Sequence, residues 1–279
     1  MKPKFEGAEP KRKDEVPFRE VPEQTFSDRG PRATLRKFAS DPSFFVRRLG
    51  IDWLNKEIDL VRERQNLRTT GGRGGLSGLP GPSEEKKGEL NKELSGAARE
   101  IQHAFEELRD IYRIPLDARC IVGKDETGEP GLWMVSRNVG GEELELREFK
   151  EPERNRARSI LDDLLVSLIR YARDKWAKGE LLLWDIFRIE QYRWGRISKN
   201  EEERAYLVDV DPYFGHEHSL SNPNHVLRYI GQFVDWSERK TGAEMDRART
   251  ELKNLEVHFE KYKPEYAKLL RSILRNRGA

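Results

Sequence analysis

Acidic side chains border two short apolar segments near the middle of the chain. Asp185 precedes the first segment, Ile189–Trp194, whereas Asp209 lies near the end of the second, Ala205–Val210, and Asp211 follows directly. Because successive side chains alternate along a strand, we expect Asp209 and Asp211 to face the same way. Two carboxylates in that arrangement suit a cation that prefers oxygen ligands. The simpler alternative is a surface hairpin whose acidic side chains are solvated.

The elements that would position these acids follow from the surrounding pattern. The two apolar segments are predicted to be strands, and the polar run Ser198–Glu203 between them is typical of a hairpin loop. Upstream, Pro152–Lys178 has the spacing of an amphipathic helix, and Gly179 is a typical helix stop. The residues predicted to form the buried face of this helix are Ile160, Leu164, Leu165, Leu168, Ile169, Ala172 and Trp176.

This order resembles the catalytic core of the protein kinase-like superfamily, in particular its small-molecule phosphotransferase branch. In that family a catalytic-loop Asp is followed by an amide residue, a strand, a hairpin and a second strand that ends in a metal-binding Asp. The resemblance implies that Asp185 is the catalytic residue and that Gln191 and Asp209 hold Mg²⁺. Leu183-Trp184 stands where the family has His-Arg or His-Gly, and the amide is Gln rather than Asn, one residue late.

A second point of resemblance lies upstream, in the expected order. The segment Ala118–Val139 is predicted to be a hairpin, and its second strand leads into the pattern Val-x-Gly-x-x-Leu at Val139–Leu144. This pattern is similar to the hinge between the two lobes of kinase-like phosphotransferases. The resemblance implies that the backbone from Arg137 to Val139 contacts the adenine of ATP.

The strand predicted at Phe44–Leu49 corresponds, in this resemblance, to the strand that carries the phosphate-binding lysine. Arg47 or Arg48 stands in place of that lysine. Arginine pairs with phosphate through two nitrogens, but its shape and reach differ from those of lysine. The alternative is a strand whose basic residues face water.

A strong helical pattern covers Glu89–Tyr112, and Pro115 ends it. Its apolar stripe comprises Leu90, Leu94, Ala97 or Ala98, Ile101, Phe105, Leu108 and Ile111. In the kinase-like interpretation this helix offers a glutamate, Glu100 or Glu107, to the basic strand residue. Solvated glutamates are the alternative. Further helices are predicted at Ile51–Leu67, at Pro223–Arg239, from Gly242 to Lys261, and at Tyr266–Leu274.

Composition narrows the class of protein. Among 279 residues, 52 lysines and arginines nearly balance 50 acids, which argues against a dedicated nucleic-acid binder. Cys120 is the single cysteine, so no intrachain disulfide forms. The N-terminus lacks the apolar core of a secretory signal, and no apolar run reaches the roughly 20 residues that span a bilayer. We therefore expect a cytoplasmic protein without a membrane partner.

The predicted architecture is α+β, a two-lobed protein kinase-like fold with a small mixed N-terminal lobe and a mostly helical C-terminal lobe. Residues 1–22 are expected to be a disordered tail, 23–139 the first lobe with a flexible insertion at 69–88, and 140–279 the second lobe. The resemblance implies ATP- and Mg²⁺-dependent phosphoryl transfer, impaired by the missing lysine and the altered loop, to an acceptor of unassigned chemistry. One alternative is a non-catalytic, pseudokinase-type binding or scaffold protein. The other is a helical protein that contacts nucleic acid through Arg62–Arg73 and Arg271–Arg277.

Overall fold

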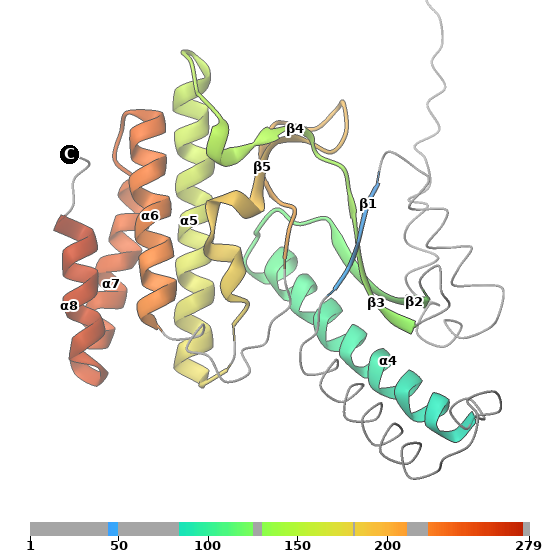
Figure 1. Cartoon of the computed structure of the whole chain (residues 1–279). Coiled ribbons are helices and arrows are strands. Elements are labelled where there is room, and N and C mark those ends of the chain that lie inside the picture. The colour runs from blue at the N-terminus through green and yellow to red at the C-terminus, as the bar shows by residue number, and fades with distance from the viewer. Residues whose placement is uncertain (1–43, 50–83, 125–129, 181, 211–222, 276–279) are drawn as a thin grey trace, which may run out of the picture. The chain divides into compact units, whose positions relative to one another are not determined.

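The computed structural model describes residues 44–49, 84–124, 130–180, 182–210 and 223–275 (Figure 1). These residues combine helices with two small three-stranded sheets, so the fold is mixed α and β, as predicted. The chain forms two compact units. The first contains the described residues up to His103 together with Ala118–Ser136. The second contains Ala104–Asp117 and the described residues from Arg137 onward. The predicted tail 1–22, the helix Ile51–Leu67 and residues 69–83 of the insertion 69–88 lie outside the described residues, whereas residues 84–88 begin helix α4 at Glu84–Glu106.

The first unit is built on a three-stranded sheet with the order β1-β3-β2. Its strands are β1 at Phe44–Arg48, β2 at Ala118–Lys124 and β3 at Pro130–Arg137, and the predicted antiparallel pairing of β2 with β3 is confirmed. Ile121 and Val135 are buried at its centre, because β-branched side chains pack well on a pleated surface. Helix α4 is tied to this sheet by the Gln102 side chain, whose Oε1 accepts the Cys120 N–H at 3.1 Å.

The helix predicted at Glu89–Tyr112 is confirmed, but its last turn differs from an α-helix. Helix α4 spans Glu84–Glu106 and continues as a π-helix over Glu107–Ile111. In that turn the Tyr112 N–H donates to the Glu107 carbonyl five residues back, at 3.2 Å. The wider turn rotates the residues that follow away from the buried stripe. The prediction that Ile111 belongs to this stripe is wrong, since the residue is 67% exposed.

The second unit contains a sheet with the order β4-β5-β6, in which both pairs are antiparallel. Its strands are β4 at Gly140–Glu143, β5 at Tyr192–Arg196 and β6 at Arg204–Leu207. The predicted acidic hairpin is confirmed, with shifted limits. The first half of the predicted strand Ile189–Trp194 is a 3-10 turn, and the second strand ends at Leu207, so Asp209 lies beyond the strand rather than on it.

Two glycines allow β4 and β5 to pair closely. Gly141 lies opposite Gly195, and a Cβ atom on Gly141 would come within 2.0 Å of the Trp194 carbonyl oxygen. A Cβ on Gly195 would come within 2.3 Å of the Gly140 carbonyl oxygen. Only glycine tolerates such an approach of two backbones. The Gly-Gly pair after Val139 therefore has a structural role as the start of a strand that the sequence did not predict.

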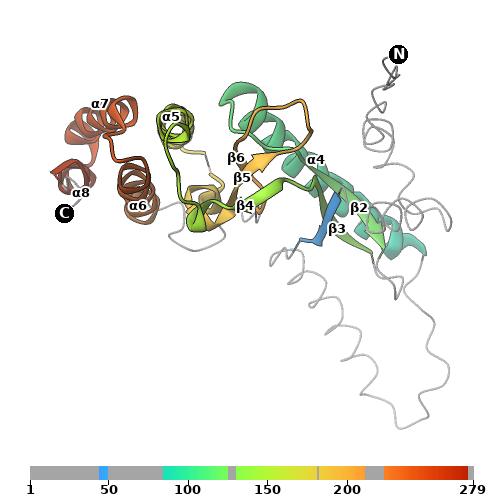
Figure 2. The ribbon, with the colours of Figure 1, turned by 90° about the horizontal axis from the view of Figure 1, so that it is seen from above.

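Four helices complete the second unit: α5 at Glu153–Lys178, α6 at Pro223–Thr241, α7 at Asp246–Tyr262 and α8 at Pro264–Arg275. Helix α5 contacts α6 and α7, and α8 packs on α6 and α7 (Figure 2). Gly179 ends α5 in the left-handed conformation, with φ 67°, as predicted. Buried Asp162 on α5 accepts the N–H groups of Arg247 and Ala248, and so satisfies donors that the start of α7 leaves without helical partners.

None of the helices within the described ranges combines the length and the apolar character needed to cross a membrane.

Candidate functional site

The loop that carries Asp185 is held by hydrogen bonds to the elements around it. It forms two 3-10 turns, Trp184–Phe187 and Ile189–Gln191, directly before β5. The Leu183 N–H donates to the Tyr171 hydroxyl of α5 at 2.9 Å, and the Tyr192 hydroxyl donates to the Ile186 carbonyl at 2.7 Å. Burial and the nearby charge of Asp185 raise the pKa of Tyr192 well above its usual value, so its phenol stays protonated. The loop is therefore a fixed part of the second unit.

Asp185 itself is enclosed and faces a cation. The residue is only 2% exposed, and its Oδ1 lies 3.3 Å from Nη1 of Arg188. The Arg188 guanidinium also binds Glu190 and lies 5.8 Å from the centre of the Trp184 ring. Partial burial opposes the charged form of Arg188, but the hydrogen bond to Glu190 and the charges of Glu190 and Asp185 outweigh it and raise the pKa of the guanidinium. The Asp185 carboxylate is therefore paired with a guanidinium that stays positively charged.

Gln191 and Asp209, the expected metal ligands, are adjacent through their backbones. The Gln191 carbonyl accepts the N–H of Val208 at 2.9 Å and that of Asp209 at 3.4 Å. Gln191 is buried and Asp209 is half-buried. Asp211, the expected companion of Asp209, lies outside the described residues. Within the described ranges, no three His, Cys, Asp or Glu side chains gather as a metal site would require.

The hinge-like segment leads directly into β4. The Arg137 side chain forms an ion pair with Asp117, and its backbone N–H donates to the Asp117 carbonyl at 3.3 Å. Asn138 is exposed and Val139 is buried. The Arg137 side chain is thus engaged within the protein, while the backbone that follows passes the start of the β4-β5-β6 sheet.

The two arginines expected to replace the phosphate-binding lysine lie on β1, in the first unit. Arg48 is exposed, and its guanidinium covers Gly131, where a Cβ atom would come within 2.9 Å of Nε. The backbone of Arg47 belongs to the same strand.

The expectation that Glu107 serves a strand arginine is wrong. Its carboxylate lies 2.7 Å from Nζ of Lys175 on α5, with both side chains nearly buried. Lys175 also binds Glu180 at 2.9 Å. Glu100 is an exposed residue of α4. Glu107 therefore ties the start of the π-helical turn to α5.

In one basic patch of the nucleic-acid alternative, Arg271–Arg277, the first arginine is paired with acids. Arg271 on α8 binds Glu256 at 2.7 Å and Glu260 at 2.5 Å, both on α7. The other patch, Arg62–Arg73, lies outside the described residues.

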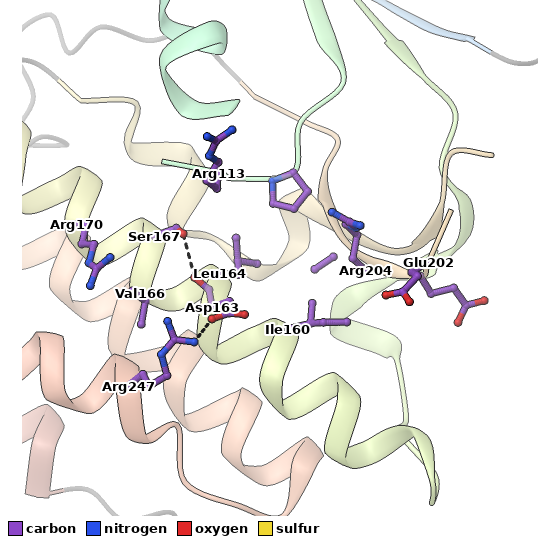
Figure 3. Close-up of a pocket in the computed structure, with 13 residues that line it drawn as sticks. Arg113, Ile160, Asp163, Leu164, Val166, Ser167, Arg170, Glu202, Arg204 and Arg247 are labelled. Atoms are coloured by element: carbon purple, nitrogen blue, oxygen red, sulfur yellow. Dashed lines mark hydrogen bonds and ion pairs between the residues drawn. The ribbon is translucent and has the colours of Figure 1, made fainter. Parts of the chain in front are cut away.

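A cavity of about 350 Å³ in the second unit was not expected from the sequence. Four arginines surround it, Arg113, Arg170, Arg204 and Arg247, with Ser167 between them (Figure 3). They come from the segment after the π-helical turn, from α5, from β6 and from α7. No local motif unites residues so far apart in the chain, so no signal in the sequence could have brought these four arginines together.

Comparison of the chain with protein-family models, with curated proteins and with solved structures finds no match.

Proposed function

We propose that the second unit binds ATP together with Mg²⁺ in a kinase-like manner, and that it transfers the phosphoryl group slowly or not at all. The observation that carries the proposal is the backbone contact between the Asp185–Gln191 loop and Asp209. The Gln191 carbonyl accepts both the Val208 and the Asp209 N–H, so the amide residue and the acid that would share a metal start from adjacent backbones.

The donor set suits Mg²⁺ when phosphate oxygens are also present. Asp209 offers carboxylate oxygens and Gln191 an amide oxygen, and Mg²⁺ prefers hard oxygen ligands. In proteins Mg²⁺ commonly keeps several waters and binds one or two carboxylates plus the phosphates of a substrate. The described residues hold no cluster of three metal-binding acids, histidines or cysteines. We therefore expect Mg²⁺ to bind with the nucleotide, whose phosphate charge it would neutralise, and not alone.

The register of the sheet is compatible with an extended nucleotide. Gly140, directly after the hinge-like segment, pairs with Arg196, whereas Gln191 precedes Tyr192 at the other end of β5. The four residue steps from Tyr192 to Arg196 correspond to about 13 Å of strand. That is comparable to the length of ATP from the base to the last phosphate. The backbone at Arg137–Val139 would meet the adenine, and Asp209 would lie near the phosphates.

The same loop argues for weak chemistry. A residue that orients or deprotonates an acceptor hydroxyl must reach it within hydrogen-bonding distance. Asp185 is 2% exposed and already faces the Arg188 guanidinium at 3.3 Å. In the kinase-like interpretation Arg47 or Arg48 also stands in place of the positioning lysine, and loss of a positioning group commonly costs orders of magnitude in rate. Binding needs less, because the hinge backbone and the metal ligands hold a nucleotide without a reactive carboxylate. These features favour the pseudokinase-type alternative over an efficient enzyme.

Titration calorimetry with ATP, with and without Mg²⁺, tests the binding claim. We expect weak binding that strengthens when Mg²⁺ is added. Asp209→Asn should abolish the Mg²⁺ dependence while the thermal unfolding midpoint stays near that of the unmodified protein. Asp110→Asn is the matched control, because Asp110 is an exposed carboxylate paired with Arg109 on the π-helical turn.

Three results would overturn the proposal. Absence of ATP binding at millimolar nucleotide, with and without Mg²⁺, rejects the binding claim, as does an unchanged Mg²⁺ dependence in Asp209→Asn. Rapid ATP turnover by the unmodified protein rejects the claim of impaired chemistry.

A further inference from the structure

The cavity bounded by Arg113, Arg170, Arg204 and Arg247, called here the arginine cavity, has two kinds of wall. Apolar side chains form one part of its lining: Pro115, Ile160, Leu164, Val166 and Ala205. Charged groups and the Ser167 hydroxyl form the rest (Figure 3). Its volume of about 350 Å³ is at the lower end of the range of small-molecule sites. The arginine cavity therefore suits a small ligand with one apolar and one polar end.

The carboxylates around the arginine cavity are each matched by an arginine. Asp163 pairs with Arg247. At the other end, the side chains of Glu202 and Glu203 bind Arg156 at 3.4 Å and Arg196 at 2.7 Å. Each of these acids is therefore already in an ion pair with one arginine.

Only some of the four arginines of the cavity form ion pairs with carboxylates. Arg170 binds Glu251 on α7 at 2.6 Å. Neither Arg113 nor Arg204 forms an ion pair with any other residue of the described ranges. The wall of the arginine cavity therefore holds two arginines, Arg113 and Arg204, that form no ion pair within the described ranges, although the charge of Asp110 acts on Arg113.

We propose that the arginine cavity binds a small phosphate monoester with an apolar body. A phosphate monoester carries between −1.5 and −2 charges near pH 7, which balances two arginines. Guanidinium groups pair with phosphate oxygens through parallel hydrogen bonds. The aliphatic side chains of α5, Ile160 and Leu164, offer the surface against which the apolar body packs.

The backbone that presents Arg113 is fixed in an unusual conformation. Arg113 has φ 61°, the only positive φ of a non-glycine residue among those described, and residues with a Cβ atom rarely adopt this left-handed conformation. Its neighbours hold it: the Ile114 N–H donates to the Leu108 carbonyl at 3.0 Å, and the Pro115 carbonyl accepts the Leu207 N–H of β6 at 2.8 Å. Arg113 and Arg204 thus belong to segments joined by backbone hydrogen bonding, which limits the ordering cost when an anion binds.

Titration of the full chain with phenyl phosphate, followed by calorimetry or by NMR line broadening of the ligand, tests the proposal. We expect binding that weakens with added salt. Arg113→Gln combined with Arg204→Gln should reduce the affinity about tenfold or more. Arg228→Gln is the matched control, because Arg228 is an exposed arginine of α6 outside the arginine cavity, and it should bind as the unmodified protein does.

Two further probes identify the ligand class. Inorganic phosphate should bind more weakly than phenyl phosphate, and phenol should not bind measurably. Asp209→Asn should bind phenyl phosphate normally, which separates this site from the nucleotide site. Three outcomes overturn the proposal: no binding of phenyl phosphate at millimolar concentration, equal binding by the double variant, or equal affinity for inorganic phosphate and phenyl phosphate.

Discussion

Removal of the Glu238 carboxylate should destabilise the helical part of the second unit more than removal of any surface carboxylate. Glu238 on α6 binds Arg249 on α7 through two contacts, at 2.6 Å and 2.5 Å, and both side chains are only 9% exposed. Glu238 also accepts the Met245 N–H at 2.9 Å, and Arg249 donates to the Leu274 carbonyl of α8 at 3.2 Å. One ion pair therefore connects three helices.

The expected loss of unfolding free energy follows from the two polar groups that Glu238→Ala leaves without a partner. Glu238→Ala leaves a nearly buried guanidinium without its carboxylate, which costs about 3–5 kcal/mol, and leaves the Met245 N–H without its acceptor, about 1 kcal/mol more. Some solvent reaches the pair, so we expect a loss of about 3 kcal/mol in the free energy of unfolding. For a unit of this size that lowers the melting temperature by roughly 10 °C. Glu238→Gln keeps the shape and one acceptor oxygen, and should cost about half as much.

The pH dependence has a defined sign. Burial disfavours the charged form of Glu238, but the hydrogen bond from Arg249, the Met245 N–H and the charge of Arg249 outweigh it and lower the pKa of the carboxyl below its ordinary 4.5. A carboxyl whose pKa is lower in the folded state contributes stability above the unfolded pKa and loses it as the pH falls through the folded pKa. The stability difference between the unmodified protein and Glu238→Gln should therefore be constant above about pH 5 and shrink as the pH falls below 4.5.

Urea unfolding followed by circular dichroism measures both effects. Glu256→Ala is the control, because Glu256 pairs with the more exposed Arg271 and should cost no more than about 1 kcal/mol. The reasoning fails if Glu238→Ala unfolds within 1 kcal/mol of the unmodified protein. It fails equally if the difference between Glu238→Gln and the unmodified protein stays constant from pH 7 to pH 3.5.

Two further predictions concern the close approach of β4 and β5 and the ion pair between Glu107 and Lys175. Gly141→Ala should destabilise the protein by about 2–4 kcal/mol in urea unfolding, because its Cβ would meet the backbone oxygen of Trp194 at 2.0 Å, whereas Gly96→Ala, with open space around its Cβ, should be neutral or stabilising by up to about 1 kcal/mol. If Gly141→Ala unfolds at the same urea concentration as the unmodified protein, β4 and β5 are farther apart than the structure shows. Glu107→Gln should cost about 1–2 kcal/mol by the same assay, and the loss should disappear in a Lys175→Met background, because the substitutions remove one shared ion pair. Additive losses would refute that coupling.

The helices and hairpins of this protein were predictable because their signals are local. Helix α5 shows apolar side chains at spacings of three and four and ends at Gly179, where the left-handed conformation is observed. The β2-β3 hairpin and the β5-β6 hairpin each place a polar turn between two apolar runs. The limits of β5 and β6 shifted by up to three residues, since strand ends depend on the partner strand and not on the strand's own composition.

Short strands with atypical composition cannot be predicted from the alternation of apolar and polar residues. Strand β4 has the sequence Gly-Gly-Glu-Glu and is exposed along its whole length, so it carries no alternation of apolar and polar residues. It is a strand because Gly141 and Gly195 let two backbones approach, a property of the pair. The π-helical turn at Glu107–Ile111 likewise continues the helical pattern of the sequence, so its wider geometry was not predicted.

The sequence alone determined that Asp185, Gln191 and Asp209 lie in one short region. The tertiary structure decided what surrounds them. It enclosed Asp185 beside Arg188 and joined the backbones of Gln191 and Asp209. It also gathered the arginine cavity from four distant segments. The physical reason is that burial and charge compensation depend on neighbours in space, and residues 50 to 90 positions apart become neighbours only when the chain folds.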